Sequence, residues 1–137
     1  MKTHEIFVDT SFFKAIADPK DDFHEDALNI FDRLTEEKTT LITSNFILDE
    51  TYTLIRKRCG IEKVRQFTLA LEEFEIGLEI IRVKPIDEQK AWDWFWKDWS
   101  GLSFTDCVSF ALMQRLGLTR VATFDTHFSK AGFAVEK

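Results

Sequence analysis

Short, mostly apolar runs along the chain alternate with stretches in which apolar residues recur at helical spacing. The runs at 6–9, 40–43, 78–83 and 120–124 are typical of buried strands, because a strand covered on both faces is apolar throughout. Helical spacing follows the first run, with apolar residues three to four positions apart at Phe23, Ala27, Ile30, Phe31 and Leu34. The pattern predicts strands and helices in alternation.

Capping and stop signals set the limits of the helices. Ser44 is a good N-cap for a helix over 45–59, and Gly60 follows it as a stop signal. Further helices are predicted over about 61–74, 87–99 and 104–116, and Pro85 ends the strand before the second of them. The segment 133–137 is predicted to add an edge strand.

Strands separated by helices require crossover connections and therefore parallel pairing. The sequence predicts an α/β fold, a three-layer α/β/α sandwich around a mainly parallel sheet. Neither an internal repeat nor a Pro/Gly/Ser-rich linker divides the chain, so we expect a single domain over 1–137.

The charge balance limits the partners. The 137 residues carry 18 Lys and Arg against 24 Asp and Glu, a net charge of −6, so the surface as a whole should repel polyanions. Contact with nucleic acid must then be local or mediated by a metal ion. No apolar run reaches the roughly 20 residues that cross a bilayer, and no signal peptide is evident, so we expect a cytoplasmic protein without a membrane partner.

Four acidic residues lie where a parallel sheet gathers its ligand sites, beyond the carboxyl ends of the strands. Asp9 and Asp125 end or follow strands. Asp106 stands in the first turn of its helix, and Glu50 lies in the second turn after Ser44. Four carboxylates at one edge would repel one another unless a cation neutralised them. An oxygen-only cluster without His or Cys suits Mg²⁺ or Mn²⁺ rather than zinc.

Each acid also has a purely structural explanation. Asp9 could cap the turn after its strand, and Asp125 could form an Asx turn. Asp106 could complement a helix N-terminus, and Glu50 could simply be solvated. Only their convergence would favour the metal site.

Four segments that contain these acids closely resemble the acidic motifs of the PIN-domain nuclease family: FVDTSFF, SNFILDET, LSFTDCVS and ATFDTHF, in this order. The resemblance extends from Ile6 to Phe128 and fits the small, VapC-like group. It implies that Asp9, Glu50, Asp106 and Asp125 bind Mg²⁺ or Mn²⁺. It also implies hydrolysis of single-stranded RNA by a metal-activated water, with 5′ phosphate and 3′ hydroxyl products. Small relatives of this kind are often toxins, which implies a homodimer and a small antitoxin partner.

The same motifs imply supporting roles for neighbouring hydroxyls. Thr10 and Ser11 would hold the turn at Asp9, and Thr105 and Thr123 would bond to the acids or to a water; plain capping is the alternative. His127 occupies a position that is often acidic in relatives, and we interpret it as solvated or in contact with phosphate rather than as a metal ligand.

Two further segments are candidates for RNA contact. Arg56 and Lys57 belong to a basic cluster beyond Glu50, which could equally complement the C-terminus of its helix. In the Trp-rich helix, Trp92, Phe95, Trp96 and Trp99 share one face that we expect in the core. Trp94 should point elsewhere, toward an RNA base or a second subunit.

The sequence disfavours three other functions. A catalytically silent RNA-binding or scaffold domain would keep the fold, but it would have no use for mutually repelling acids. A haloacid dehalogenase phosphatase is similar in placing an Asp after the first strand, yet its second Asp is missing from DTSFF. A dinucleotide-binding fold is disfavoured, because no glycine-rich turn follows that strand.

Overall fold

The structure is a computed structural model that describes residues 4–73 and 77–137. Within these residues the strands form one parallel sheet in the order β3-β2-β1-β4-β5. The strands are β1 Glu5–Val8, β2 Thr40–Ser44, β3 Leu78–Ile81, β4 Arg120–Ala122 and β5 Ala134–Val135. Residues 134–135 form the edge strand predicted at the C-terminus.

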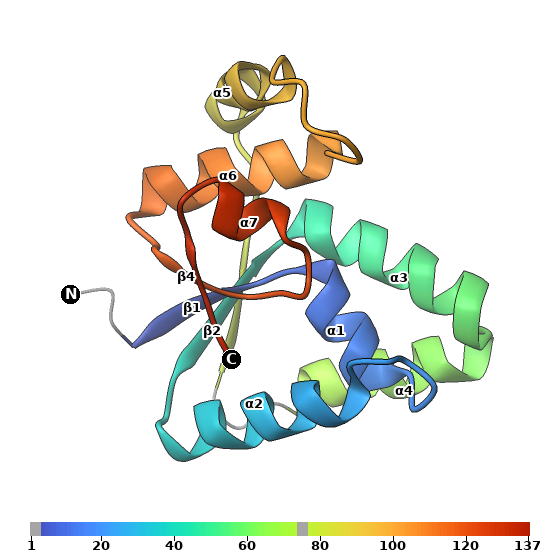
Figure 1. The fold of residues 1–137 in the computed structure, drawn as a ribbon. Coiled ribbons are helices and arrows are strands. Elements are labelled where there is room, and N and C mark those ends of the chain that lie inside the picture. The colour runs from blue at the N-terminus through green and yellow to red at the C-terminus, as the bar shows by residue number, and fades with distance from the viewer. Residues whose placement is uncertain (1–3, 74–76) are drawn as a thin grey trace.

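Helices cover both faces of this sheet. Figure 1 shows one layer below and to the right of the strands, made of α1 Thr10–Ala17, α2 His24–Glu36, α3 Asn45–Cys59 and α4 Ile61–Glu72. The layer above contains α5 Pro85–Phe95, α6 Phe104–Leu116 and α7 His127–Lys130. The predicted three-layer α/β/α sandwich is confirmed.

Capping and stop residues in the sequence predicted some helix boundaries more accurately than others. The hydroxyl of Ser44 accepts a hydrogen bond from the Ile47 amide at 3.1 Å, and Gly60 ends α3 with a φ of 91°. The α6 limits also agree with the prediction. The helix expected over 87–99 is shifted, because Pro85 begins α5 instead of preceding it. Position 74, where the helix from 61 was expected to end, lies outside the described residues.

The prediction for the Trp-rich segment is wrong for three of its four residues, whereas Trp99 packs against the core. Trp92, Phe95 and Trp96 are exposed by 43%, 36% and 76%, whereas the Trp94 ring packs against Phe110 with centroids 5.1 Å apart. The reason is that α5 contacts α6 through its face at positions 87, 91 and 94. On that face the buried carboxylate of Asp87 pairs with an arginine of α6.

The core lies between the sheet and both helical layers. Its largest buried side chains include Phe7 of β1, Phe12 of α1, Phe110 of α6 and Phe128 of α7. In the part of the chain that is described, no helix is long and apolar enough to span a membrane.

Candidate functional site

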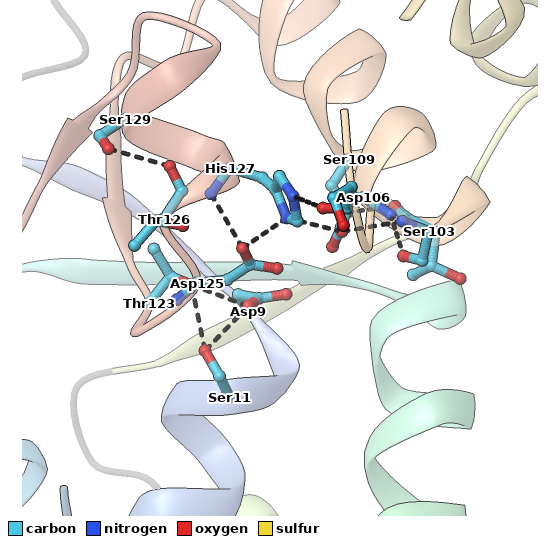
Figure 2. Close-up of polar contacts among 12 residues, drawn as sticks. Asp9, Ser11, Ser103, Asp106, Ser109, Thr123, Asp125, Thr126, His127 and Ser129 are labelled. Atoms are coloured by element: carbon cyan, nitrogen blue, oxygen red, sulfur yellow. Dashed lines mark hydrogen bonds and ion pairs between the residues drawn. The ribbon is translucent and has the colours of Figure 1, made fainter. Parts of the chain in front are cut away.

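The pairing of β1 with β4 brings two distant acidic segments together. Phe7 lies opposite Val121, and the ladder continues past the strand end, where the Asp9 amide donates to the Ala122 carbonyl at 3.1 Å. The residues after both strands therefore meet at the carboxyl edge of the sheet. Figure 2 shows Asp9 and Asp125 side by side at this edge.

The side chain of Asp9 does not cap the helix that it precedes. Asp9 occupies the N-cap position of α1, but its carboxylate makes no capping hydrogen bond. Instead, Asp9 Oδ2 accepts hydrogen bonds from Ser11 Oγ at 3.0 Å and Thr123 Oγ1 at 2.8 Å (Figure 2). The capping explanation therefore fails for this residue, which is only 3% exposed.

Asp106 enters the site from the first turn of α6, where it also takes part in a capping box. Asp106 Oδ2 accepts from the Ser103 amide at 3.2 Å, and Ser103 Oγ accepts from the Asp106 amide at 3.0 Å. The box fixes the carboxylate through one of its two oxygens. Capping therefore accounts for part of the role of Asp106.

Asp125 and His127 form the third side of the site. Asp125 Oδ1 accepts from the His127 amide at 2.9 Å, which is the Asx turn that the sequence allowed. The ring Nε2 of His127 lies 2.8 Å from the Ser100 carbonyl, which can only accept, so this nitrogen carries a proton. In the neutral ring, Nδ1 then presents a lone pair toward the acids.

The environment of this nitrogen is unusual. His127 Nδ1 lies 2.7 Å from Asp125 Oδ1 and 3.8 Å from Asp106 Oδ2. This nitrogen is buried, and it forms no hydrogen bond with the described residues. Ligand atoms of these three residues all lie within 4.8 Å of one another. A lone pair facing two carboxylates is repulsive unless a cation or a proton lies between them.

The interpretation of His127 as a solvated side chain is therefore corrected. Its ring is stacked parallel to Trp99, with an interplanar angle of 4° and centroids 6.5 Å apart. The Ser100 carbonyl that orients the ring belongs to the loop between α5 and α6. No pattern in the sequence links that loop to the segment after β4.

Burial and repulsion by neighbouring charges make two of the acids, Asp9 and Asp106, hard to ionise. Burial, with a smaller effect from Asp125, raises the pKa of Asp9 to about 6 despite its bonds from Thr123 and Ser11. Burial and then the charges of Asp125 and Asp9 raise the pKa of Asp106 to about 7. In the described part of the chain, no Lys or Arg forms an ion pair with these three acids.

The side chains of the other predicted residues form no hydrogen bond or ion pair with these three acids in the described part of the chain. Glu50 is half-buried in the second turn of α3 and makes no hydrogen bond or ion pair with described residues. The hydroxyl of Thr10 joins α1 to α3, through the Ile47 carbonyl at 3.4 Å and Thr51 Oγ1 at 3.3 Å, rather than bonding to Asp9. Thr105 accepts a bond from Ser109 through its carbonyl, and its hydroxyl contacts no acid in the described residues.

The residues predicted to contact RNA lie in different parts of the fold. Arg56 and Lys57 are exposed in the last turn of α3. Trp94 is half-buried between Phe110 and Trp99. Arg58, which follows Lys57 in the same helical turn, lines a groove that reaches Asp125.

The donor set suits a hard divalent cation. Carboxylate oxygens of Asp9, Asp106 and Asp125 supply uncompensated negative charge, and an imidazole nitrogen is compatible with Mn²⁺. A bound cation would satisfy the unpartnered Nδ1 of His127 and stabilise the ionised forms of the two acids whose pKa values are raised.

A parallel α/β sheet with buried acids at its carboxyl edge defines a class of α/β proteins whose ligand site lies at that edge. The sequence from residue 6 to 134 matches the PIN domain family, and the chain belongs to that family.

Its relatives include an enzyme from Mycobacterium tuberculosis, in strains CDC 1551 / Oshkosh and H37Rv, named 23S rRNA-specific endonuclease VapC20. The identity is 34% over 132 residues, which cover 93% of this chain and 95% of the relative. The crystal structure of Mycobacterium tuberculosis VapC20, described as a sarcin-ricin loop cleaving toxin, superimposes with a TM-score of 0.82 and 32% identity. The match covers 94% of this chain and 96% of that one.

Proposed function

We propose that this protein is a metal-dependent endoribonuclease that cuts single-stranded RNA and acts as the toxin of a toxin-antitoxin pair. The observation that carries the proposal is the convergence of three buried or half-buried acids without a cationic partner among the described residues. The similarity to an endonuclease named for 23S rRNA supports RNA as the substrate. The sarcin-ricin loop is therefore the first RNA to test.

Asp9, Asp106 and Asp125 are the proposed ligands of Mg²⁺ or Mn²⁺, with Glu50 as a fourth acid from α3. The orientation of His127 Nδ1 supports its inclusion as a nitrogen ligand. When bound, such an ion lowers the pKa of a water molecule and stabilises charge on the departing 3′ oxygen. The proposed products are a 5′ phosphate and a 3′ hydroxyl, since water replaces the ribose hydroxyl as nucleophile.

The surrounding residues hold the ligands in place. Ser11 and Thr123 donate to the same oxygen of Asp9, so they orient the carboxylate and favour its ionised form. The capping box of Ser103 fixes Asp106, and the Ser100 carbonyl selects the tautomer of His127. Each support comes from a loop or helix start at the carboxyl edge of the sheet.

Replacing Asp9 by Asn tests the proposal, because it keeps the size of the side chain and removes its charge. We expect the Asp9→Asn variant to lose metal-dependent cleavage of a sarcin-ricin loop RNA and to bind Mn²⁺ more weakly by calorimetry. Asp49→Asn, at an exposed position of α3, is the matched control and should keep both. Full cleavage by Asp9→Asn would refute the proposal, and wild-type protein that binds no Mn²⁺ would favour a silent RNA-binding domain.

We also propose a homodimer and inhibition by a small antitoxin. Exposed Trp92 and Trp96, which stack on each other with centroids 5.1 Å apart, support a protein contact on α5. Light scattering of the purified protein measures the oligomeric state, and a monomer at micromolar concentration would contradict the dimer.

A further inference from the structure

Three aromatic rings form a column that runs from the core to the surface beside the acids. The buried ring of Phe12 stacks on Phe124 with centroids 6.0 Å apart and an interplanar angle of 17°. Phe124 in turn stacks on Phe23, with centroids 4.5 Å apart and an angle of 7°. Phe23 is 44% exposed although one of its faces is covered by Phe124. The column therefore ends in an aromatic surface open to solvent.

This column forms a wall of a groove that includes part of the proposed metal site. The groove has a volume of about 430 Å³, and both Ser11 and Asp125 line it together with Phe23 and Phe124. Because Phe124 directly precedes Asp125, the aromatic wall and the acid are fixed to each other by the same turn of the backbone. A ligand held in the groove would thus lie next to the acids.

The cations that line the groove differ in their availability. Lys14 Nζ is 2.9 Å from both Asp18 and Asp21, so its charge is already offset. Arg58, from the last turn of α3, is exposed and forms no ion pair with the described residues. Arg58 is thus the cation of this groove that can accept an anionic ligand.

A second groove is also lined by Phe23 and Phe124. It has a volume of about 640 Å³ and contains Arg33, whose guanidinium pairs with Glu37 and Glu136. Its lining also includes Asp26 and Lys137, but none of Asp9, Asp106 and Asp125. A phosphate next to the acids is therefore favoured on the side of Arg58, which shares its groove with Asp125.

We propose that the smaller groove is a nucleotide subsite, in which a base next to the scissile phosphate stacks on Phe23 and Arg58 binds a phosphate of the same strand. This proposal rests on the proposed ribonuclease function. Stacking suits an RNA loop, because its unpaired bases can be turned out onto aromatic side chains. The structure thereby assigns phosphate contact to Arg58, whereas the sequence had indicated Arg56 and Lys57.

The test compares cleavage of a sarcin-ricin loop hairpin by matched variants. Phe23→Ala should raise KM roughly ten-fold or more, because stacking is lost in both the ground state and the transition state. Phe23→Trp keeps an aromatic ring and should restore the wild-type KM. Arg58→Ala should raise KM and flatten its dependence on salt, because one phosphate contact is removed. Arg65→Ala, at an exposed position of α4 that lines neither groove, is the control and should behave like wild type.

A spectroscopic measurement makes the result independent of turnover. With 2-aminopurine at successive positions of the loop, wild-type protein should quench its fluorescence at one position, and Phe23→Ala should not. If the wild type cuts the RNA but Phe23→Ala leaves KM and quenching unchanged, the subsite is refuted while the ribonuclease function stands. If the wild type neither binds nor cuts this RNA or a mixed RNA pool, both proposals fail.

Discussion

Replacing Asp106 by Asn should make the metal-free protein more stable while removing part of the metal site. Asp106 is 5% exposed, and burial and the charges of Asp125 and Asp9 raise its pKa from 3.8 to about 7. At pH 8 the folded protein must therefore keep an ionised carboxylate that it disfavours. Asparagine removes that charge and still offers a side-chain oxygen to the amide of Ser103.

The magnitude follows from the size of the pKa change. Each unit corresponds to about 1.36 kcal/mol, so a rise of roughly three units costs the ionised folded state about 4 kcal/mol. A neutral amide accepts a weaker hydrogen bond from Ser103 than a carboxylate does, which offsets roughly 1 kcal/mol. We expect a net gain of about 2–3 kcal/mol at pH 8, or a Tm higher by roughly 6–15 °C for a chain of this length.

The sign depends on pH. The pKa of Asp106 is higher in the folded protein than in the unfolded chain. The stability that the protonated acid contributes to the fold is therefore fully present below pH 3.8 and is lost as pH rises through about 7. Denaturation in EDTA at pH 4.5, 6 and 8 should show the two proteins diverging as pH rises, with Asp49→Asn parallel to wild type throughout. A variant less stable than wild type at pH 8, or an equal difference at all pH values, would refute the reasoning.

Two other predictions concern the ion and the α5–α6 contact. Mn²⁺ should bind the wild type more tightly as pH rises from 5.5 to 7.5, by roughly ten-fold per pH unit for each proton displaced. Calorimetry in two buffers should detect the released protons, and pH-independent binding would contradict the prediction. Arg115→Ala should lower the free energy of unfolding by about 3–5 kcal/mol, because Asp87 is 1% exposed and accepts from that guanidinium at 2.7 and 2.9 Å. In the Asp87 carboxyl, burial raises the pKa, but the bonds from Arg115 outweigh it and the net pKa is lowered. The exposed pair of Arg65 with Glu62 is the control, and Arg65→Ala should change stability by less than about 1 kcal/mol.

Local chemistry explains which parts of the fold were predictable. The limits of α3 depend on Ser44 and Gly60, which act within one turn of the chain, and both were readable from the sequence. The orientation of α5 depends instead on Asp87 reaching Arg115, a partner 28 residues away. Helical spacing alone ranked four large aromatic residues as core, although a buried ion pair and Ala91 occupy the face that packs.

The same distinction applies to the site. Asp9, Asp106 and Asp125 were recognisable because each follows a strand or begins a helix at the edge where parallel strands end. The burial and orientation of His127 could not be predicted, because the Ser100 carbonyl positions its ring and a backbone oxygen cannot be recognised from residue type. The column that ends at Phe23 was likewise hidden, since its rings come from three separate segments.

The position of Asp9 shows why capping does not account for a carboxylate here. Serine or asparagine would serve equally well at an N-cap, yet Asp9 makes no capping bond and has its pKa raised by burial. Ser11 and Thr123 offset part of the cost of ionisation by donating to one oxygen, which aligns the group without neutralising it. Burial still works against the charge, so a cation outside the polypeptide would stabilise it. A divalent cation bound by Asp9 together with Asp106 and Asp125 would have this effect.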